Sequence, residues 1–149
     1  MTISSIAFNP VAGTGASTTF FELYVDMGYC SSTELGANYE SNYVSGTKIR
    51  VFSRPSNFTV TATSPWTALV LDSPFFYDPA NGNLIIDIAW PDGEDEFYSY
   101  SYVTAGVASV SGAYGEATGD TFGDSSFLRL EGVYALEQIT FAGIKATFN

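Results

Sequence analysis

The sequence predicts an all-β protein with a single domain over residues 1–149, and three observations support this prediction. Only 14% of the residues are charged, well below the roughly 25% of an average globular protein, while 46% are apolar and 16% aromatic. Twelve Phe, ten Tyr and fourteen Gly favour strands and tight turns over helices. Short segments of alternating apolar and polar residues recur along the chain, with turn residues between them.

Residues 74–90 contain the clearest of these segments and predict a hairpin of two strands. An Asn-Gly dipeptide, which accepts positive φ, stands at residues 81–82, and the Asp-Pro dipeptide before it disfavours helix. In the second strand Asp87 lies on the weaker face. The apolar residues that share the other face are Leu84, Ile86 and Ile88.

Five further strands are predicted before this hairpin, and proline, glycine or polar residues separate them. They span residues 2–8, 18–27, 47–53, 58–62 and 66–71. Between the second and third strands the chain is polar and rich in turn residues, which predicts a long surface connection over residues 28–45. A capping-box pattern at residues 31–34 indicates one short helical turn there.

Alternation within two of these strands predicts which side chains face the core. The residues expected to point inward are Phe21, Leu23, Val25, Ile49 and Val51. Those expected at the surface are Glu22, Tyr24, Asp26, Lys48 and Arg50.

After the hairpin, an acidic turn at residues 91–96 leads into a strand at 97–103. A weak strand at 107–110 follows, and then a loop around Asp120 and Asp124. The last predicted strands span residues 127–134, 136–139 and 144–148. About ten short strands without a convincing helix indicate a two-sheet antiparallel β-sandwich, with the jelly roll as its expected topology.

The charge and the missing residue types exclude several classes of function. Sixteen acidic and five basic residues give a formal charge of −11, which argues against nucleic acid and anionic membranes as partners. The single cysteine, Cys30, excludes an internal disulfide, and the absence of His excludes His-containing zinc sites and Ser-His-Asp or Cys-His catalytic groups. No apolar run reaches the about 18 residues of a membrane-spanning helix.

Carboxylate chemistry is the main enzymatic alternative that this composition leaves. A glycosidase needs two carboxyl groups about 5–10 Å apart in a cleft. Asp87 together with a second acidic residue could meet this requirement, but so could many other pairs of acidic residues in the sequence. We therefore expect the protein not to be an enzyme.

A tyrosine stripe in the strand at residues 97–103 is the first candidate binding site. Tyr98, Tyr100 and Tyr102 share one face and predict a platform on which sugar rings stack. In the alternative interpretation this face packs inward and the interleaved serines face solvent.

Other aromatic residues offer further sugar contacts. Trp66 and Trp90 each lie beside a proline at a strand end, where they either line a groove or pack at the rim of the core. The tyrosines in and before the long polar connection are alternative contacts. These are Tyr24, Tyr29, Tyr39 and Tyr43.

The acidic turn supplies candidate metal ligands. Carboxylates are the oxygen ligands that calcium prefers, although the spacing here does not match an EF-hand loop. The candidate ligands are Asp92, Glu94, Asp95 and Glu96. A solvated acidic turn explains the same residues, so we expect no required cofactor and keep calcium as an option.

Three segments, at residues 3–8, 66–78 and 82–88, carry a family resemblance. They resemble a β-sandwich domain that recurs in exported bacterial proteins with C-terminal sorting signals of the PEP-CTERM-like or gliding-associated secretion types. The resemblance covers most of residues 2–90 and implies an extracellular or cell-surface location without known catalytic residues. Members usually carry a further strand before the first segment, whereas this chain begins at Met1. We therefore expect an open sheet edge beside residues 2–8, able to pair with another chain.

These observations predict a non-catalytic extracellular protein with a structural or adhesive role. In this hypothesis it self-associates through strand edges into a surface filament or layer. The alternative is a monomeric carbohydrate-binding module that uses the exposed tyrosines and tryptophans to hold a polysaccharide.

Overall fold

The computed structural model describes residues 1–11, 15–30, 32, 34–63, 65–91, 101–103, 108–126 and 128–134. Within these ranges the regular structure consists of antiparallel strands and two short 3-10 helices, η1 (Glu40–Asn42) and η2 (Pro79–Asn81), which confirms the all-β class. Five of the predicted strands lie wholly or partly outside the described residues, at 97–103, 107–110, 127–134, 136–139 and 144–148.

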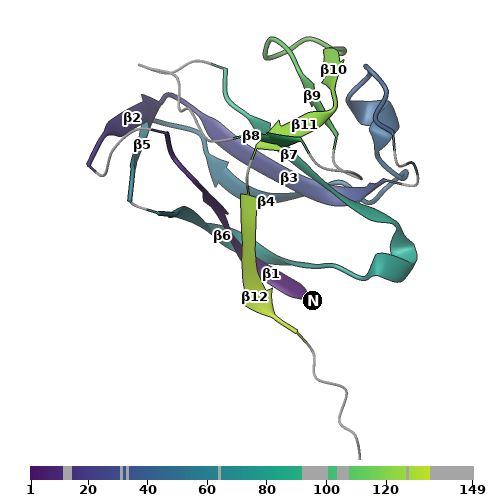
Figure 1. Cartoon of the computed structure of the whole chain (residues 1–149), viewed down its shortest axis with the longest axis horizontal. Coiled ribbons are helices and arrows are strands. Elements are labelled where there is room, and N and C mark those ends of the chain that lie inside the picture. Colours follow the sequence, from purple (N-terminus) through teal and green to yellow (C-terminus); the bar gives the residue numbers. More distant parts are fainter. Residues whose placement is uncertain are drawn as a thin grey trace, which may run out of the picture.

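Two three-stranded sheets form the centre of the fold, with the orders β12-β1-β6 and β4-β3-β7 (Figure 1). Their strands are β1 (Thr2–Phe8), β6 (Thr67–Phe76), β12 (Leu128–Val133), β3 (Leu23–Cys30), β4 (Ile49–Arg54) and β7 (Asn83–Ala89). Three two-stranded pairs complete the described structure: β2 (Ser17–Phe20) with β5 (Phe58–Thr61), β8 (Ser101–Val103) with β11 (Asp124–Ser126), and β9 (Ser109–Ser111) with β10 (Asp120–Phe122).

The two three-stranded sheets contribute side chains to one hydrophobic core. Its largest fully buried side chains come from β1, β3 and β4, and β6 adds Leu69, Leu71 and Phe75. These large residues are Phe52, Ile3, Ile6, Met27, Val25 and Val51. Leu84, Ile86 and Ile88 of β7 pack against the same core, so the predicted face of that strand is confirmed. Burial of these apolar faces is the main force that stabilises the sheets.

The predicted hairpin at residues 74–90 is wrong in its pairing, although both strands exist. β6 pairs with β1 and β7 pairs with β3, so this segment crosses from one sheet to the other. The turn chemistry holds: the Asp78 carboxylate accepts a hydrogen bond from the Ala80 N–H at 3.0 Å and caps η2. Gly82 follows with φ +129°, where a Cβ would lie 2.8 Å from the carbonyl oxygen of Cys30. Glycine therefore fits this crossing.

The single strand predicted at residues 18–27 is divided into β2 and β3. The chain bends at Phe21 and Glu22, so β2 pairs with β5 while β3 pairs with β4 and β7. Leu23 and Val25 are buried as predicted, but Phe21 is 42% exposed. Asp26, expected at the surface, is only 7% exposed because basic side chains from the β4 side cover it.

The predicted orientation of the strand at 47–53 is only partly confirmed. Val51 is buried and Arg50 exposed, but Ile49 is 52% exposed, and Phe52 is buried beside Val51. The pairing of β3 with β4 shifts register between Val25 and Asp26. Such an irregularity interrupts the two-residue alternation, so a simple odd-even rule fails here.

Two further expectations are corrected. The loop predicted around Asp120 and Asp124 contains the short strands β10 and β11. Residues 2–8 form the central strand β1, which pairs with β6 on one side and β12 on the other. The expected open edge beside this strand is therefore absent, since both of its edges are paired.

The neighbouring edges of β4 and β6 are joined by an ionic contact. Asp72 of β6 accepts hydrogen bonds from the Arg54 guanidinium and from the Ser53 N–H, each at 2.8 Å. The Arg54 guanidinium also lies 4.1 Å from the ring centroid of Phe52. These contacts tie β4 of one sheet to β6 of the other.

We expect this contact to make stability dependent on pH. The hydrogen bonds from Arg54 and then from Ser53 lower the pKa of the Asp72 carboxyl below its ordinary value. A lowered pKa in the folded state means that the contribution to stability is present above the unfolded-state pKa, about 3.9, and is lost as the pH falls through the folded pKa. Thermal unfolding should therefore give a higher Tm for the wild type than for Asp72→Asn above about pH 5, and the difference should vanish toward about pH 2. Asp120→Asn, which changes an exposed residue of β10, is the matched control. If the difference in Tm between the wild type and Asp72→Asn did not change with pH, the lowered pKa of Asp72 would be contradicted.

Candidate functional site

A pocket with a volume of about 410 Å³ lies between the connection after β3, strand β7 and strand β9. Its polar lining comes from all three segments, and the apolar residues of the wall include Leu84, Ile86, Val110 and Leu128 of β12. The polar residues are Ser32, Tyr39, Asn42, Tyr43, Asn83, Asp87 and Ser109. Figure 1 shows the connection that carries η1 next to β9 and β10.

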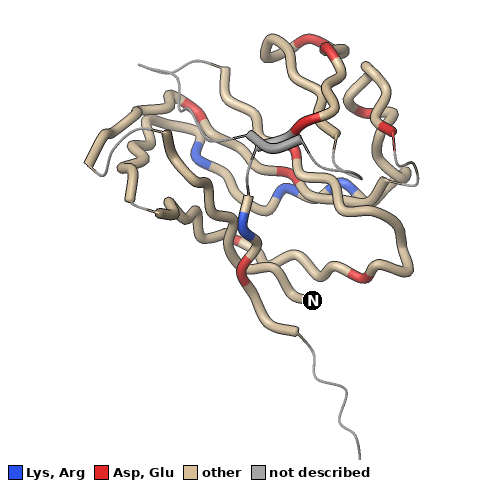
Figure 2. Tube along the Cα trace, in the orientation of Figure 1, with Lys and Arg blue, Asp and Glu red and all other residues tan. Residues whose placement is uncertain are grey.

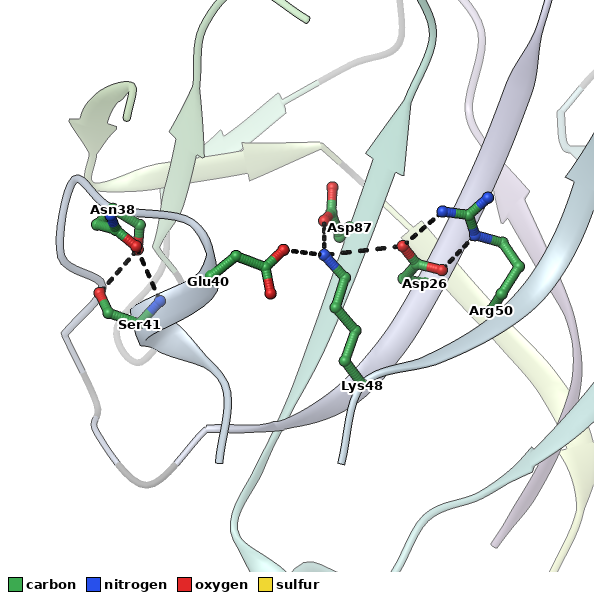
Figure 3. Close-up of polar contacts among 7 residues, drawn as sticks. All are labelled: Asp26, Asn38, Glu40, Ser41, Lys48, Arg50 and Asp87. Atoms are coloured by element: carbon green, nitrogen blue, oxygen red, sulfur yellow. Dashed lines mark hydrogen bonds and ion pairs between the residues drawn. The ribbon is translucent and has the colours of Figure 1, made fainter. Parts of the chain in front are cut away.

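Hydrogen bonds within the connection fix the wall that carries the tyrosines. The Asn42 side chain accepts from the Gly36 N–H at 2.8 Å and donates to the Gly36 carbonyl at 2.9 Å. Asn38 accepts from the Ser41 N–H at 3.0 Å at the start of η1 (Figure 3). Since Asn and Ser side chains can replace backbone partners in this way, the polar composition of this segment produces an ordered loop.

The same wall is attached to the segment that leads into β10. The Tyr39 N–H donates to the Ala117 carbonyl at 3.2 Å, and the Gly119 N–H donates to the Ala37 carbonyl at 2.9 Å. A Cβ at Gly112 would lie 2.6 Å from the Tyr39 hydroxyl, and a Cβ at Gly119 would approach that hydroxyl even more closely. The two glycines therefore leave the space in which Tyr39 sits.

Asp87 of the pocket wall belongs to a cluster of charged residues beside the pocket (Figure 3). Register places Asp26 of β3 directly opposite Asp87 of β7, a repulsive arrangement when like charges stand alone. Lys48 offsets it: its Nζ atom lies 3.2 Å from Asp87, 3.8 Å from Asp26 and 2.5 Å from Glu40. Arg50 binds both carboxylate oxygens of Asp26, with Nη2 3.1 Å from Oδ2. The carboxylates thus outnumber the cations by one.

These contacts perturb the titration of both cations. Burial lowers the pKa of the Lys48 ammonium, but hydrogen bonds to Glu40 and Asp87 outweigh burial and raise that pKa above its ordinary value. The hydrogen bond to Asp26 raises the pKa of the Arg50 guanidinium. Lys48 therefore remains charged at neutral pH and is occupied by carboxylates, which makes it a poor general base.

Tyr43 contributes a buried hydroxyl that has no hydrogen-bond partner among the residues the structure describes. Its ring lies over Gly28, where a Cβ would be 2.8 Å from the ring atom Cδ1, and Lys48 Nζ is 4.9 Å from the ring centroid. Burial, together with the charges of Asp87, Asp26 and Glu40, raises the pKa of Tyr43. The phenol is therefore neutral and keeps its proton.

The structure brings together only part of the predicted aromatic site. Tyr98 and Tyr100 lie outside the described residues. Tyr102 lies in β8, where its backbone pairs with Ser125 of β11. Trp66 lies beside the Arg129 guanidinium, 4.8 Å from its ring centroid, whereas Trp90 packs edge-to-face on Phe20 at 6.0 Å. The tryptophans thus contact different strands, and neither is among the residues that line the pocket.

Of the four alternative tyrosines, Tyr39 and Tyr43 line the pocket. Tyr29 is buried in the core, where its hydroxyl donates to the Phe76 carbonyl at 3.0 Å and accepts from the Asp78 N–H at 2.9 Å. Tyr24 donates to Glu22 at 2.7 Å and stacks on Arg50. The charge cluster beside the pocket was not predicted. Its members come from strands β3, β4 and β7, from η1 and from the connection before β4, and the sequence does not reveal how these segments meet.

The predicted calcium ligands Asp92, Glu94, Asp95 and Glu96 all lie outside the described residues, so calcium binding there stays a prediction. Within the described ranges no group of three or more His, Cys, Asp or Glu residues is arranged to hold a metal ion. In the same part of the chain no helix is long and apolar enough to cross a membrane. Comparison with models of protein families, with curated proteins and with solved structures gives no significant match.

Proposed function

We propose that the protein is a non-catalytic extracellular β-sandwich module, of the jelly-roll type, that binds a neutral carbohydrate in the pocket described above. One observation carries this proposal: Tyr39, Tyr43 and Asp87 line a single pocket of about 410 Å³. Ligand pockets have volumes of about 300–1,000 Å³, so this pocket suits one or two sugar units. The extracellular location in this proposal rests on the resemblance of most of residues 2–90 to exported bacterial β-sandwich domains.

The chemistry of the lining matches sugar hydroxyl groups. Aromatic rings pack on the apolar faces of sugars, and carboxylate and phenol oxygens exchange hydrogen bonds with sugar hydroxyls. The Tyr43 hydroxyl lacks a partner in the described structure, and a buried hydroxyl without a hydrogen bond is unfavourable by roughly 1–3 kcal/mol. Because this hydroxyl oxygen is itself buried, its missing partner would be an internal water or a group brought in by movement of the wall, and the sugar contacts rest on the Tyr39 and Tyr43 rings and on Asp87.

The charge distribution favours a neutral ligand over an anionic one. The chain carries a formal charge of −11, and all four basic side chains in the described ranges form ion pairs. Figure 2 shows the few basic positions scattered among more numerous acidic ones. An acidic sugar or a nucleic acid would therefore find no unpaired cation in this part of the molecule.

The lining also favours binding over hydrolysis. Asp87 is the one acidic residue among the described residues of the pocket wall, and it is ion-paired with Lys48. Glycoside hydrolysis uses two carboxyl groups, one of which must hold or release a proton. Binding therefore needs neither a catalytic pair nor a cofactor.

Affinity electrophoresis in gels that contain β-glucan, xylan or galactomannan tests this proposal. We expect at least one polysaccharide to retard the wild type, and Tyr39→Ala to weaken binding about tenfold because an aromatic contact is worth about 0.5–1.5 kcal/mol. Tyr114→Ala is the matched control, since Tyr114 is 53% exposed and does not line the pocket. Equal retardation of Tyr39→Ala and Tyr114→Ala, or no retardation of the wild type in any gel, would overturn the proposal.

A second candidate function is structural or adhesive self-association through strand edges. One observation favours it: within the described residues, the outer edge of β12 pairs with no strand. An unpaired edge presents backbone N–H and C=O groups to another chain.

A further inference from the structure

Strand β12 has an outer edge that pairs with no described strand, and charged and apolar side chains alternate between its two faces. Leu128 and Leu130 pack against the hydrophobic core. Arg129 and Glu131, which alternate with them, form an ion pair with each other, and the Arg129 guanidinium lies beside Trp66. Each copy of this edge therefore presents one cation and one anion on one face and two leucines on the other.

The position of β12 is fixed from its paired side. Leu130 lies opposite Ile6 of β1, and Glu131 accepts a hydrogen bond from the Ser5 hydroxyl at 3.2 Å. At the end of the strand Val133, and just beyond it Tyr134, are each 71% exposed and add apolar surface. A chain that pairs with this edge would thus meet a strand already held in an extended conformation, which reduces the entropy lost on pairing.

We propose that two copies of the chain associate through their β12 strands, antiparallel, with a two-fold axis at Leu130. In this register Arg129 of each copy stands opposite Glu131 of the other, and Leu130 stands opposite its own copy. An axis at Arg129 or at Glu131 would instead place like charges opposite each other, which is unfavourable. Axes at Leu128 or Gly132 would bring neither like nor opposite charges of β12 together. The axis at Leu130 therefore gives the register with the most favourable charge pairing, and in it the sheets β12-β1-β6 of the two copies become continuous.

The symmetry of this contact limits the assembly that it forms. A two-fold interface uses the same surface on both copies and closes as a dimer. The contact of Arg54 and Ser53 with Asp72 links β4 to β6 at one point only, so the dimer follows from the symmetry of the β12 contact and not from closure of the other edges. This inference refines the second candidate function to a dimer and does not depend on sugar binding.

Light scattering coupled to size-exclusion chromatography tests the dimer with charge-swapped variants. At about 100 μM, a hundredfold above a micromolar Kd, the wild type should have twice the chain mass of 16.0 kDa. Arg129→Glu alone and Glu131→Arg alone each place like charges opposite each other twice, so each should raise the Kd at least tenfold. A dilution series from about 100 to about 1 μM measures this shift, because most of each variant would still be dimeric at the highest concentration. An equimolar mixture of these two variants, and the double variant that carries both changes, should return to the dimer mass.

The equimolar mixture and the double variant distinguish loss of association from loss of folding. Circular dichroism of each single variant should match the wild type, and the mixture can form dimers only if both variants are folded. A monomeric wild type, an unchanged dimer in Arg129→Glu, or a mixture that stays monomeric would overturn the inference. Polysaccharide retardation is measured on the same variants and should be unchanged, because neither residue lines the pocket.

Discussion

Phe52→Ala should lower the free energy of unfolding by about 3–5 kcal/mol, since a large buried ring is replaced by a methyl group and a cavity remains. Phe52 is 1% exposed in the core, and the Phe58 ring packs on it edge-to-face with 5.6 Å between centroids. The side chains around Phe52 come from hydrogen-bonded strands, so they can move only a little to fill the cavity. Equilibrium unfolding in urea, monitored by circular dichroism, measures the change.

Phe76→Ala is the matched control for this substitution. Phe76 lies at the end of β6 and is 62% exposed, so its removal should change the free energy of unfolding by less than about 0.5 kcal/mol. Similar losses for the two variants would contradict the position of Phe52 in the core.

Gly132→Ala should lower the free energy of unfolding by about 1–3 kcal/mol, the usual range for overpacking. A Cβ at Gly132 would overlap the carbonyl group of Thr2 and lie 3.0 Å from the Cα atom of Ile3. These are backbone atoms of β1, so no side-chain rotation relieves the overlap and the end of β12 must move away. The same urea experiment measures the loss.

Gly123→Ala provides the control for Gly132→Ala, because a Cβ at Gly123 would meet nothing within 4 Å. We expect Gly123→Ala to leave stability unchanged or slightly higher, since alanine restricts the unfolded chain. If β12 forms the proposed dimer, Gly132→Ala should also weaken dimerisation while Gly123→Ala should not. Equal stability of the two variants would contradict the close pairing of β12 with β1.

The proposed pocket and the proposed dimer interface support each other functionally. Each copy would carry one pocket, so a dimer offers two binding sites to a polysaccharide chain. Two linked sites bind a repetitive ligand more tightly than one site when both can be engaged at once. Weak binding in a single pocket is therefore compatible with strong retention of the dimer on a polymer.

Local chemistry made several elements predictable from the sequence. The strand at residues 2–8 has the predicted bounds, and the inward face of β7 follows from its alternation. Asp78, Pro79 and Gly82 form the expected turn, because capping, a fixed φ and a positive φ are properties of single residues. Composition alone indicated the all-β class. These features depend on neighbours within a few positions along the chain.

Only the tertiary structure decided which strands pair and what their pairing creates. The alternation in β6 and β7 is the same whether the two strands form a hairpin or cross between sheets, so the predicted hairpin failed. Asp26 was expected at the surface, but the register of β3 with β4 and β7 brings Arg50 and Asp87 to it and leads to its burial. The pocket likewise combines segments more than sixty residues apart. Side-chain periodicity specifies the two faces of a strand, whereas its neighbours depend on long-range pairing, which no local pattern encodes.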